Sequence, residues 1–245
     1  MLKELGPGFR LMVVFTVLLG ILYPAAITGL SALIFPKQAG GSLVKVDGKV
    51  IGSSLIGQSF SNPEYFHPRP SAAGSGYDAS ASSGTNLGPT SAKLIHGTTK
   101  KDDTGKEVVD FDGISLRVVH YCLENGIAFD SSIPLDRFKN DKGDLDDVKL
   151  IQAFNDDKTP LIFTPKSPIP ADAVTASASG LDPHISVATA EIQVSRVAQA
   201  RGVAPNQIHN LIASNTAGPD FGILGEPGVN VLMLNITLDE HFPKK

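Results

Sequence analysis

The sequence lacks much of what several functional classes require. Its 245 residues contain one cysteine, Cys122, and no tryptophan. A single cysteine cannot form an intramolecular disulfide, so we interpret Cys122 as a small buried hydrophobic residue. The net charge is −4, and no long run of basic residues occurs in the chain. Nucleic acid, which attracts basic surfaces, is therefore excluded as a partner.

Motifs for catalysis and metal binding are also missing. Gly105-Lys106 does not complete a phosphate-binding P-loop, and the acidic run at 141–147 does not fit a calcium-binding EF-hand. The six histidines are dispersed, and none forms a zinc pair. Ser42 and Lys45 match a short serine–lysine motif without its companion motifs. We predict no catalytic residue, no metal site and no cofactor of the chain's own.

The longest apolar segment lies near the N-terminus, at residues 11–35. It has no charged residue in 25 positions, and 14 of these are Leu, Ile, Val or Phe. A helix of this length spans roughly 37 Å, against a hydrocarbon core of about 30 Å. Transfer of those 14 side chains into a bilayer is favourable by roughly 4 to 8 kcal/mol as an upper bound. We therefore predict a transmembrane helix at 11–35, with a tail at 1–10 and a soluble domain at 36–245.

A cleaved signal peptide is the alternative interpretation of this segment. The apolar core of a signal peptide normally runs for about 7 to 15 residues, whereas this segment stays apolar through Phe35. Pro24 is expected to bend the helix, and Gly29 is one of several small residues that permit close approach of a neighbouring helix. The few basic residues on either side do not fix the orientation of the helix in the membrane.

A hairpin and a small-residue segment follow. Two β-prone stretches, at 42–46 and 49–55, flank Asp47-Gly48, which suits a type I′ turn. Residues 71–91 are small and polar without apolar periodicity, which is the composition of a flexible linker. The aromatic, basic and proline-rich residues 65–70 before them predict a stiff segment that can dock.

Residues 96–166 differ in composition from the rest of the soluble part. They hold 24 of the 46 charged residues, 14 acidic and 10 basic. We interpret this stretch as an insertion with helices at 114–124 and around 145–154.

The last third of the chain predicts two helices and a strand. Ser186 is a suitable N-cap for a helix that ends at Gly202, and Pro205 suits the first turn of a second helix. Residues 229–238 are rich in β-branched and aliphatic side chains and are predicted as a strand. The fold class is thus α+β: one N-terminal transmembrane helix followed by a mixed α/β soluble domain with a charged insertion.

Several longer motifs occur in order along the chain. They are Leu22-Tyr23-Pro24, Thr28-Gly29-Leu30 and the stretches 52–60, 65–71, 83–88, 174–185 and 193–198. Together these motifs resemble the C subunit of the Kdp potassium-transporting ATPase. The chain departs from that family in the insertion, at Lys37 where an aromatic residue is common, and at Ser195 where proline is usual.

The resemblance implies a non-catalytic accessory subunit of an ATP-driven high-affinity potassium uptake pump, needed for assembly of the complex. The implied partners are a potassium-channel-like subunit, an ATP-hydrolysing subunit and membrane lipid. The resemblance also implies a single-pass protein of the cell inner membrane, with residues 1–10 in the cytoplasm and the domain at 36–245 outside it.

A second role that the family implies is that of a catalytic chaperone, which raises the ATP affinity of the hydrolysing subunit. ATP would then be reached through the complex, and Gln193 is the matching candidate residue. The two roles conflict, because an external domain cannot contact cytoplasmic ATP. A membrane-tethered enzyme, the third hypothesis, would need a catalytic constellation that the sequence does not contain.

We favour docking outside the cytoplasm, and we interpret Arg69 and Arg196 as ion-pair partners that hold the fold. The candidate docking residues are Pro24, Gly29, Gln58, Phe66, Arg69, Ser177, Gly180, Asp182 and Arg196.

Overall fold

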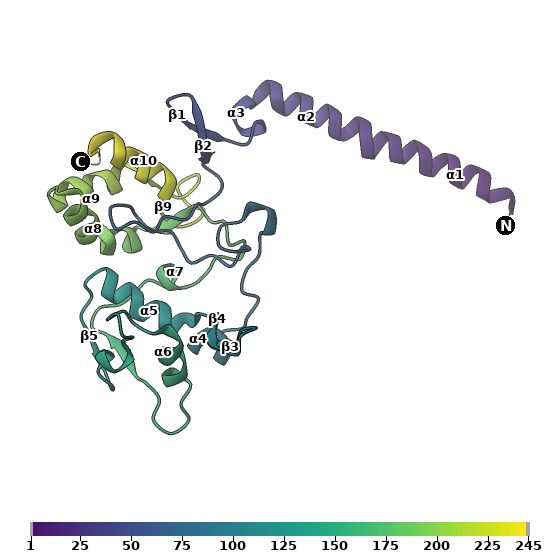
Figure 1. Cartoon of the computed structure of the whole chain (residues 1–245). Coiled ribbons are helices and arrows are strands. Elements are labelled where there is room, and N and C mark those ends of the chain that lie inside the picture. Colours follow the sequence, from purple (N-terminus) through teal and green to yellow (C-terminus); the bar gives the residue numbers. More distant parts are fainter. Residues whose placement is uncertain (1, 244–245) are drawn as a thin grey trace. The chain divides into compact units, whose positions relative to one another are not determined.

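A computed structural model describes residues 2–243 of the chain. The chain divides into two compact units, Met1–Leu55 and Ile56–Lys245, and each is described by itself. The first holds a long apolar helix, a short helix and a β-hairpin, and the second holds the remaining helices and three small groups of paired strands (Figure 1).

The apolar helix runs through three consecutive elements. These are α1 (Leu2–Val17), a π-helical turn η1 (Leu18–Leu22) and α2 (Tyr23–Ile34). The stretch Lys3–Ile34 is long and apolar enough to cross a membrane, as the sequence predicts. The helix begins at Leu2, well before the predicted start at residue 11. Pro7 lies inside α1 and lacks the N–H that would bond to the carbonyl of Lys3.

The π-helical turn explains how Pro24 is accommodated. A proline lacks the N–H that would bond to the carbonyl four residues earlier, and its ring crowds that carbonyl. In the turn just before it, the N–H of Tyr23 bonds instead to the carbonyl of Leu18, which widens the helix. The irregularity expected at Pro24 is therefore a π-helical turn in the preceding residues.

The predicted hairpin is confirmed. A short helix, α3 (Pro36–Ala39), leads into β1 (Leu43–Val46) and β2 (Lys49–Ser53), which pair antiparallel. Asp47 and Gly48 have φ values of 48° and 77°, as a type I′ turn requires.

The second unit has a C-terminal group of three helices and a three-stranded sheet. The helices are α8 (Val187–Arg201), α9 (Pro205–Ser214) and α10 (Val231–His241). The antiparallel sheet has the order β7 (His184–Ser186), β9 (Gly228–Asn230) and β8 (Thr216–Ala217). Ser186 caps α8 and Gly202 ends it in a left-handed conformation, so both signals were interpreted correctly.

The strand predicted at 229–238 is wrong beyond its first residues. Asn230 ends β9, and its side chain accepts a hydrogen bond from the N–H of Met233, which starts α10. Leu234 and Leu238 lie four residues apart on the buried face of that helix. A short apolar run fits a buried strand and a buried helix equally well, and the cap decides between them.

The charged stretch forms a second group with its own core. Helices α5 (Gly113–Glu124) and α6 (Asp147–Phe154) confirm the two that the sequence predicts. They pack through Leu116, Val119, Leu150 and Phe154. The other elements are α4 (Ala92–His96), β3 (Thr98–Lys101), β4 (Glu107–Phe111), β5 (Phe129–Ser131), η3 (Leu135–Phe138), β6 (Phe163–Pro165) and α7 (Ala171–Val174). Strands β3 and β4 form one antiparallel pair, and β5 and β6 form another.

The small-residue segment at 71–91, which includes η2 (Ala79–Ala81), is not a flexible linker in its first half. The hydroxyl of Ser71 donates to the carbonyl of Gly180 at 2.6 Å, and the N–H of Ser83 donates to the carbonyl of Ser179 at 3.0 Å. A Cβ on Gly180 would lie 2.6 Å from the carbonyl oxygen of Ser83. Small residues here permit the backbone of residues 71–83 to touch that of residues 179–180. The prediction of a flexible linker is therefore wrong for this half of the segment.

Candidate functional site

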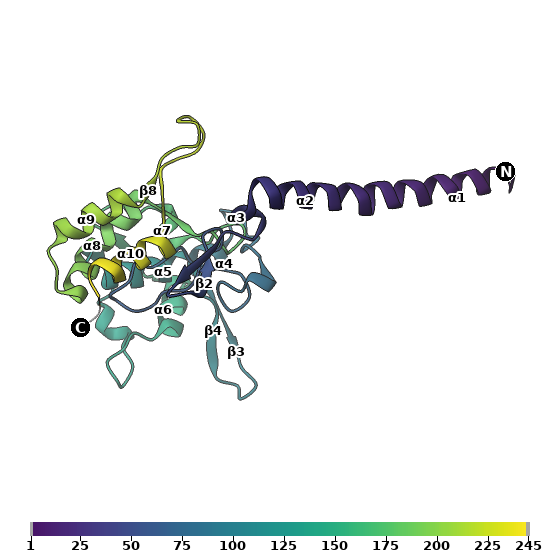
Figure 2. The ribbon, with the colours of Figure 1, turned by 90° about the horizontal axis from the view of Figure 1, so that it is seen from above.

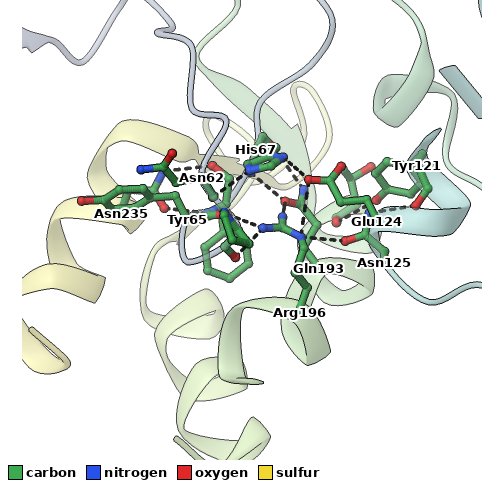
Figure 3. Close-up of polar contacts among 12 residues, drawn as sticks. Asn62, Tyr65, His67, Tyr121, Glu124, Asn125, Gln193, Arg196 and Asn235 are labelled. Carbon is green, nitrogen blue, oxygen red and sulfur yellow. Dashed lines mark hydrogen bonds and ion pairs between the residues drawn. The ribbon is translucent and has the colours of Figure 1, made fainter. Parts of the chain in front are cut away.

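Residues 57–85, which we call the strap, lie across helices α8 and α10 of the second unit. Two buried side-chain amides hold the strap by its backbone (Figure 3). Asn235 accepts from the N–H of Phe66 at 2.8 Å and donates to its carbonyl at 3.0 Å. Gln193 does the same for His67, at 2.7 Å and 3.1 Å. Each amide therefore pairs with one residue as a neighbouring strand would.

The side chain of Phe66 anchors the strap in the C-terminal core. It is 0% exposed and belongs to the same cluster as Ile185, Val194 and Leu234. Burial of a phenylalanine contributes roughly 1.5 to 3 kcal/mol. The stiff segment that the sequence predicts at 65–70 thus docks within its own chain.

Arg196 of α8 binds the backbone of the same segment. Its guanidinium donates to the carbonyls of Pro63 and Tyr65 at 2.6 and 2.8 Å, and to the amide oxygen of Gln193 at 2.6 Å. Glu124 of α5 lies 3.8 Å from the Arg196 Nε. Burial lowers the pKa of Arg196, and Glu124 opposes that shift. Arg196 is therefore a fold-holding cation, as predicted.

Arg69, the other predicted ion-pair partner, pairs with Asp182, with Nη1 and Oδ2 at 2.9 Å. The other carboxylate oxygen of Asp182 accepts from the N–H of His184 at 2.9 Å. Burial alone would raise the pKa of Asp182, but its hydrogen bonds with His184 and Arg69 outweigh burial and the net pKa lies below its usual value. Tyr77 donates to the carbonyl of Arg69 at 2.8 Å. Asp182 thus braces the turn before Ser186.

A cleft of about 400 Å³ opens beside this network. The strap, α5 and α8 each contribute to its wall, and the polar residues at the cleft include His67, Arg69, Tyr77, Asp112, Arg117, His120, Tyr121, Glu124, Asp147 and Gln193. Burial raises the pKa of both Tyr77 and Tyr121. Neither phenol is thus prepared to act as a base at neutral pH.

The titratable groups at the cleft form close contacts with one another. His67 contacts Glu124 at 2.7 Å, and His120 contacts Asp147 at 2.7 Å. Hydrogen bonding to Asp147 raises the pKa of His120. Arg117 makes a bidentate pair with Asp112 at 2.6 and 2.7 Å. Such pairing fixes the geometry of the cleft wall.

Metal and thiol chemistry find no support in the described part of the chain. Across residues 2–243, no group of three or more His, Cys, Asp or Glu side chains is placed to hold a metal ion. Cys122 is buried, and burial raises the pKa of its thiol, which opposes formation of the reactive thiolate. Cys122 is the small hydrophobic residue that the sequence suggests.

The structure brings six of the predicted site residues into one region, around the strap. These are Phe66, Arg69, Gly180, Asp182, Gln193 and Arg196. Ser177 is buried beside them, and Gln58 is partly exposed at the start of the strap. Pro24 and Gly29 lie apart from these residues in sequence, on the exposed surface of the apolar helix. Most of the candidate docking residues therefore make contacts inside the chain.

Sequence reasoning missed Asn235 and the cluster around Arg201. Arg201 pairs with Asp239 at 2.7 Å, and its guanidinium lies 4.9 Å from the ring centre of Tyr65. Tyr65 also donates to Asp239 at 2.8 Å. Asn235 could have been found, because a lone amide in an apolar run must be hydrogen-bonded once it is buried.

Comparison with known proteins places the chain in a family. The sequence pattern described as KdpC, K+-transporting ATPase, c chain matches residues 5–112 and 144–240. The chain belongs to the KdpC family. The potassium-transporting ATPase KdpC subunit of Mycobacterium tuberculosis (strain ATCC 25618 / H37Rv) is 41% identical over 239 residues, covering 98% of this chain and 99% of the relative. The KdpC subunit of Myxococcus xanthus is 43% identical, and the match covers 96% of this chain and 87% of the relative. The KdpC subunit of Koribacter versatilis is 42% identical, and the match covers 98% of this chain and 95% of the relative.

The family pattern does not match every part of the charged stretch. It leaves out residues 113–143, between its two matched parts. Helix α5, which supplies Glu124 and His120 to the cleft, lies in the part that the pattern does not match.

Proposed function

We propose that this chain is a non-catalytic accessory subunit of an ATP-driven potassium uptake pump, and that it stabilises the assembled complex. The observation that carries the proposal is family membership over nearly the whole chain. It is joined to an apolar helix long enough to cross a membrane and to a second unit whose strap is held by hydrogen bonds from Gln193, Arg196 and Asn235. Such a unit presents a rigid surface for docking.

The proposed arrangement places the apolar helix across the cell inner membrane and residues 36–245 outside the cytoplasm. Pro24 and Gly29 lie on the exposed helix surface, and a Cβ on Gly29 would meet no atom within 4 Å. Small residues permit close helix packing in lipid. The partners are then a channel-like subunit, an ATP-hydrolysing subunit and the surrounding lipid.

Deletion of this subunit tests the assembly role. Cells that lack it are expected to lose growth at micromolar potassium, and the remaining subunits are expected to leave the complex on native gels. Re-expression of the full chain restores both. Unchanged growth and an intact complex in the deletion strain would overturn the proposal.

Accessibility of one cysteine tests the orientation. In a Cys122→Ser background, Asp103→Cys lies on an exposed turn. A membrane-impermeant maleimide added to intact cells should label it fully. Labelling that requires permeabilised cells would place residues 36–245 in the cytoplasm and overturn the proposed side.

ATP binding through Gln193 is the second candidate function, and family precedent supports it. Gln193 borders the cleft, but its side chain is 1% exposed and its amide is used by His67 and Arg196. Equilibrium binding of labelled ATP to the full chain in detergent tests this function. Saturable binding that Gln193→Ala abolishes, and that the exposed control Gln199→Ala retains, would support it. Absence of saturable binding would remove it.

A further inference from the structure

The segment between β8 and β9 projects from the second unit as a narrow ribbon. Figure 2 shows this yellow-green loop standing clear of α8, α9 and α10. Three apolar side chains lie at its end and form what we call the apolar tip: Phe221 is 93% exposed, Ile223 82% and Leu224 58%. Large apolar side chains gathered at such exposure indicate an interaction site rather than a packing role.

The ribbon is ordered by its own hydrogen bonds. Thr216 pairs with Val229 at its base, and Asp220 and Leu224 exchange backbone hydrogen bonds of 2.8 and 2.9 Å across its end. Phe221 has a φ of 54°, a left-handed conformation that is uncommon for an aromatic residue. The tip is thus presented in a fixed shape, which lowers the entropy lost on binding.

Charge identifies the kind of surface that the tip fits. Asp220 and Glu226 flank the tip, and no basic residue occurs in 216–228. The whole chain also carries a net charge of −4, so a second copy would present charge of the same sign. Acidic lipid headgroups are disfavoured for the same reason. A complementary surface combines an apolar pocket with a basic rim.

We infer that the apolar tip inserts into an apolar pocket with a lysine- or arginine-bearing rim on another subunit of the potassium-transporting ATPase. The inference rests on the proposed function, because it requires that the second unit docks onto the assembled pump. It adds the element that makes the contact and the chemistry of the surface that receives it.

Photo-crosslinking in the assembled complex tests the inference. Phe221 is replaced by p-benzoylphenylalanine in the full chain, which is expressed with the other pump subunits, purified as the complex and irradiated. An adduct to another subunit, at a segment that contains both apolar and basic residues, is expected. Adducts only to lipid, only to a second copy of this chain, or to nothing in an intact complex would overturn the inference.

Two variants and a control separate the apolar and the charged contributions. Phe221→Ser with Ile223→Ser should weaken association with the other subunits by roughly tenfold or more, as buried anchor residues do. Asp220→Lys should weaken association too, whereas Asp141→Lys, the same change on a distant exposed turn, should not. Unchanged association in the double variant or in Asp220→Lys would overturn the inference.

Controls distinguish loss of docking from loss of folding and from failure of the proposed function. Because the tip is exposed, all three variants should keep the thermal unfolding midpoint of the wild-type chain. If the wild-type chain itself does not co-purify with the pump subunits, the proposed function fails. If it does, and the tip variants co-purify equally well, only the assignment of the tip fails.

Discussion

The side-chain amide of Gln193 forms two hydrogen bonds with the backbone of His67, a residue 126 positions earlier in the chain. Asn235 makes the same pair of bonds with Phe66 across 169 positions. Consecutive residues of the strap are thus held by two different helices. The stability of the second unit is expected to depend strongly on these two amides.

Truncation of Gln193 tests that dependence. Gln193→Ala removes the partner of the His67 backbone and leaves the Arg196 guanidinium without one of its acceptors. We expect the free energy of unfolding to fall by about 2 to 4 kcal/mol, measured by denaturant titration of the full chain in detergent. Gln199→Ala, an exposed substitution on the same helix, should change it by less than about 0.5 kcal/mol. Equal free energies of unfolding for the two variants would contradict the role of the Gln193 amide in holding the strap.

The close contact between the strap and residues 177–180 is tested by a pair of glycine substitutions. Gly180 and Gly202 have nearly the same φ, 67° and 66°, but only a Cβ on Gly180 would meet other atoms, at 2.6 Å from the nearest. Gly180→Ala should therefore destabilise the chain by about 2 to 4 kcal/mol, from backbone strain and crowding together.

The matched control, Gly202→Ala, keeps the backbone strain and lacks the crowding. It should lower the free energy of unfolding by about 1 kcal/mol. If both variants lose the same amount in denaturant titrations, the two backbones do not touch as described.

Asp182, through its hydrogen bonds with His184 and its pair with Arg69, gives the second unit an acid-sensitive contribution to stability. The pKa of Asp182 is lower in the folded chain than its usual 3.8, so the contribution is present above pH 3.8 and is lost as pH falls through the folded pKa. The free energy of unfolding of Asp182→Asn should depend less steeply on pH below about pH 4. Asp141→Asn, on an exposed turn, is the control and should keep the wild-type slope. Parallel curves for Asp182→Asn and the wild-type chain would refute the role of the pair.

The His120–Asp147 pair predicts a shift in the opposite direction. Asp147 raises the pKa of His120 above 6.5, so the pair stabilises the folded chain below pH 6.5 and this stabilisation is lost as pH rises through the folded pKa. NMR titration of the imidazole should give a midpoint above 6.5 in the wild-type chain and a lower midpoint in Asp147→Asn. With Asp144→Asn, a nearby acidic residue that the imidazole does not contact, the midpoint should stay where it is in the wild-type chain. If Asp147→Asn leaves the midpoint unchanged, a group other than Asp147 raises the pKa of His120.

Local signals predicted much of the fold, and long-range contacts decided the rest. The turn at Asp47-Gly48, the cap at Ser186 and the stop at Gly202 act on their nearest neighbours, so the sequence was sufficient to place them. The strand predicted at 229–238 failed because the apolar run fits two structures, and the side chain of Asn230 selects the helix. Periodicity in so short a run carries no such information.

The candidate site was only partly predictable, for the same reason. Arg69 and Arg196 could be proposed as ion-pair partners because a charge in a folded domain needs a counter-charge. Their partners lie more than a hundred residues away, or on the insertion in the case of Glu124. No local pattern shows that Gln193 faces the backbone of His67, so its structural role emerged only from the fold.

The strap also determines how late in synthesis the second unit can fold. During synthesis the apolar helix and residues 57–85 leave the ribosome first, whereas α8 and α10 come last. The side chain of Phe66 therefore has no core to pack into, and its N–H has no acceptor in Asn235, until nearly the whole chain is made. Contacts this distant in sequence slow folding and leave apolar surface open to proteases and to aggregation. A chain truncated before Asn235 cannot close its strap, so cells are expected to degrade incomplete copies before they reach a partner.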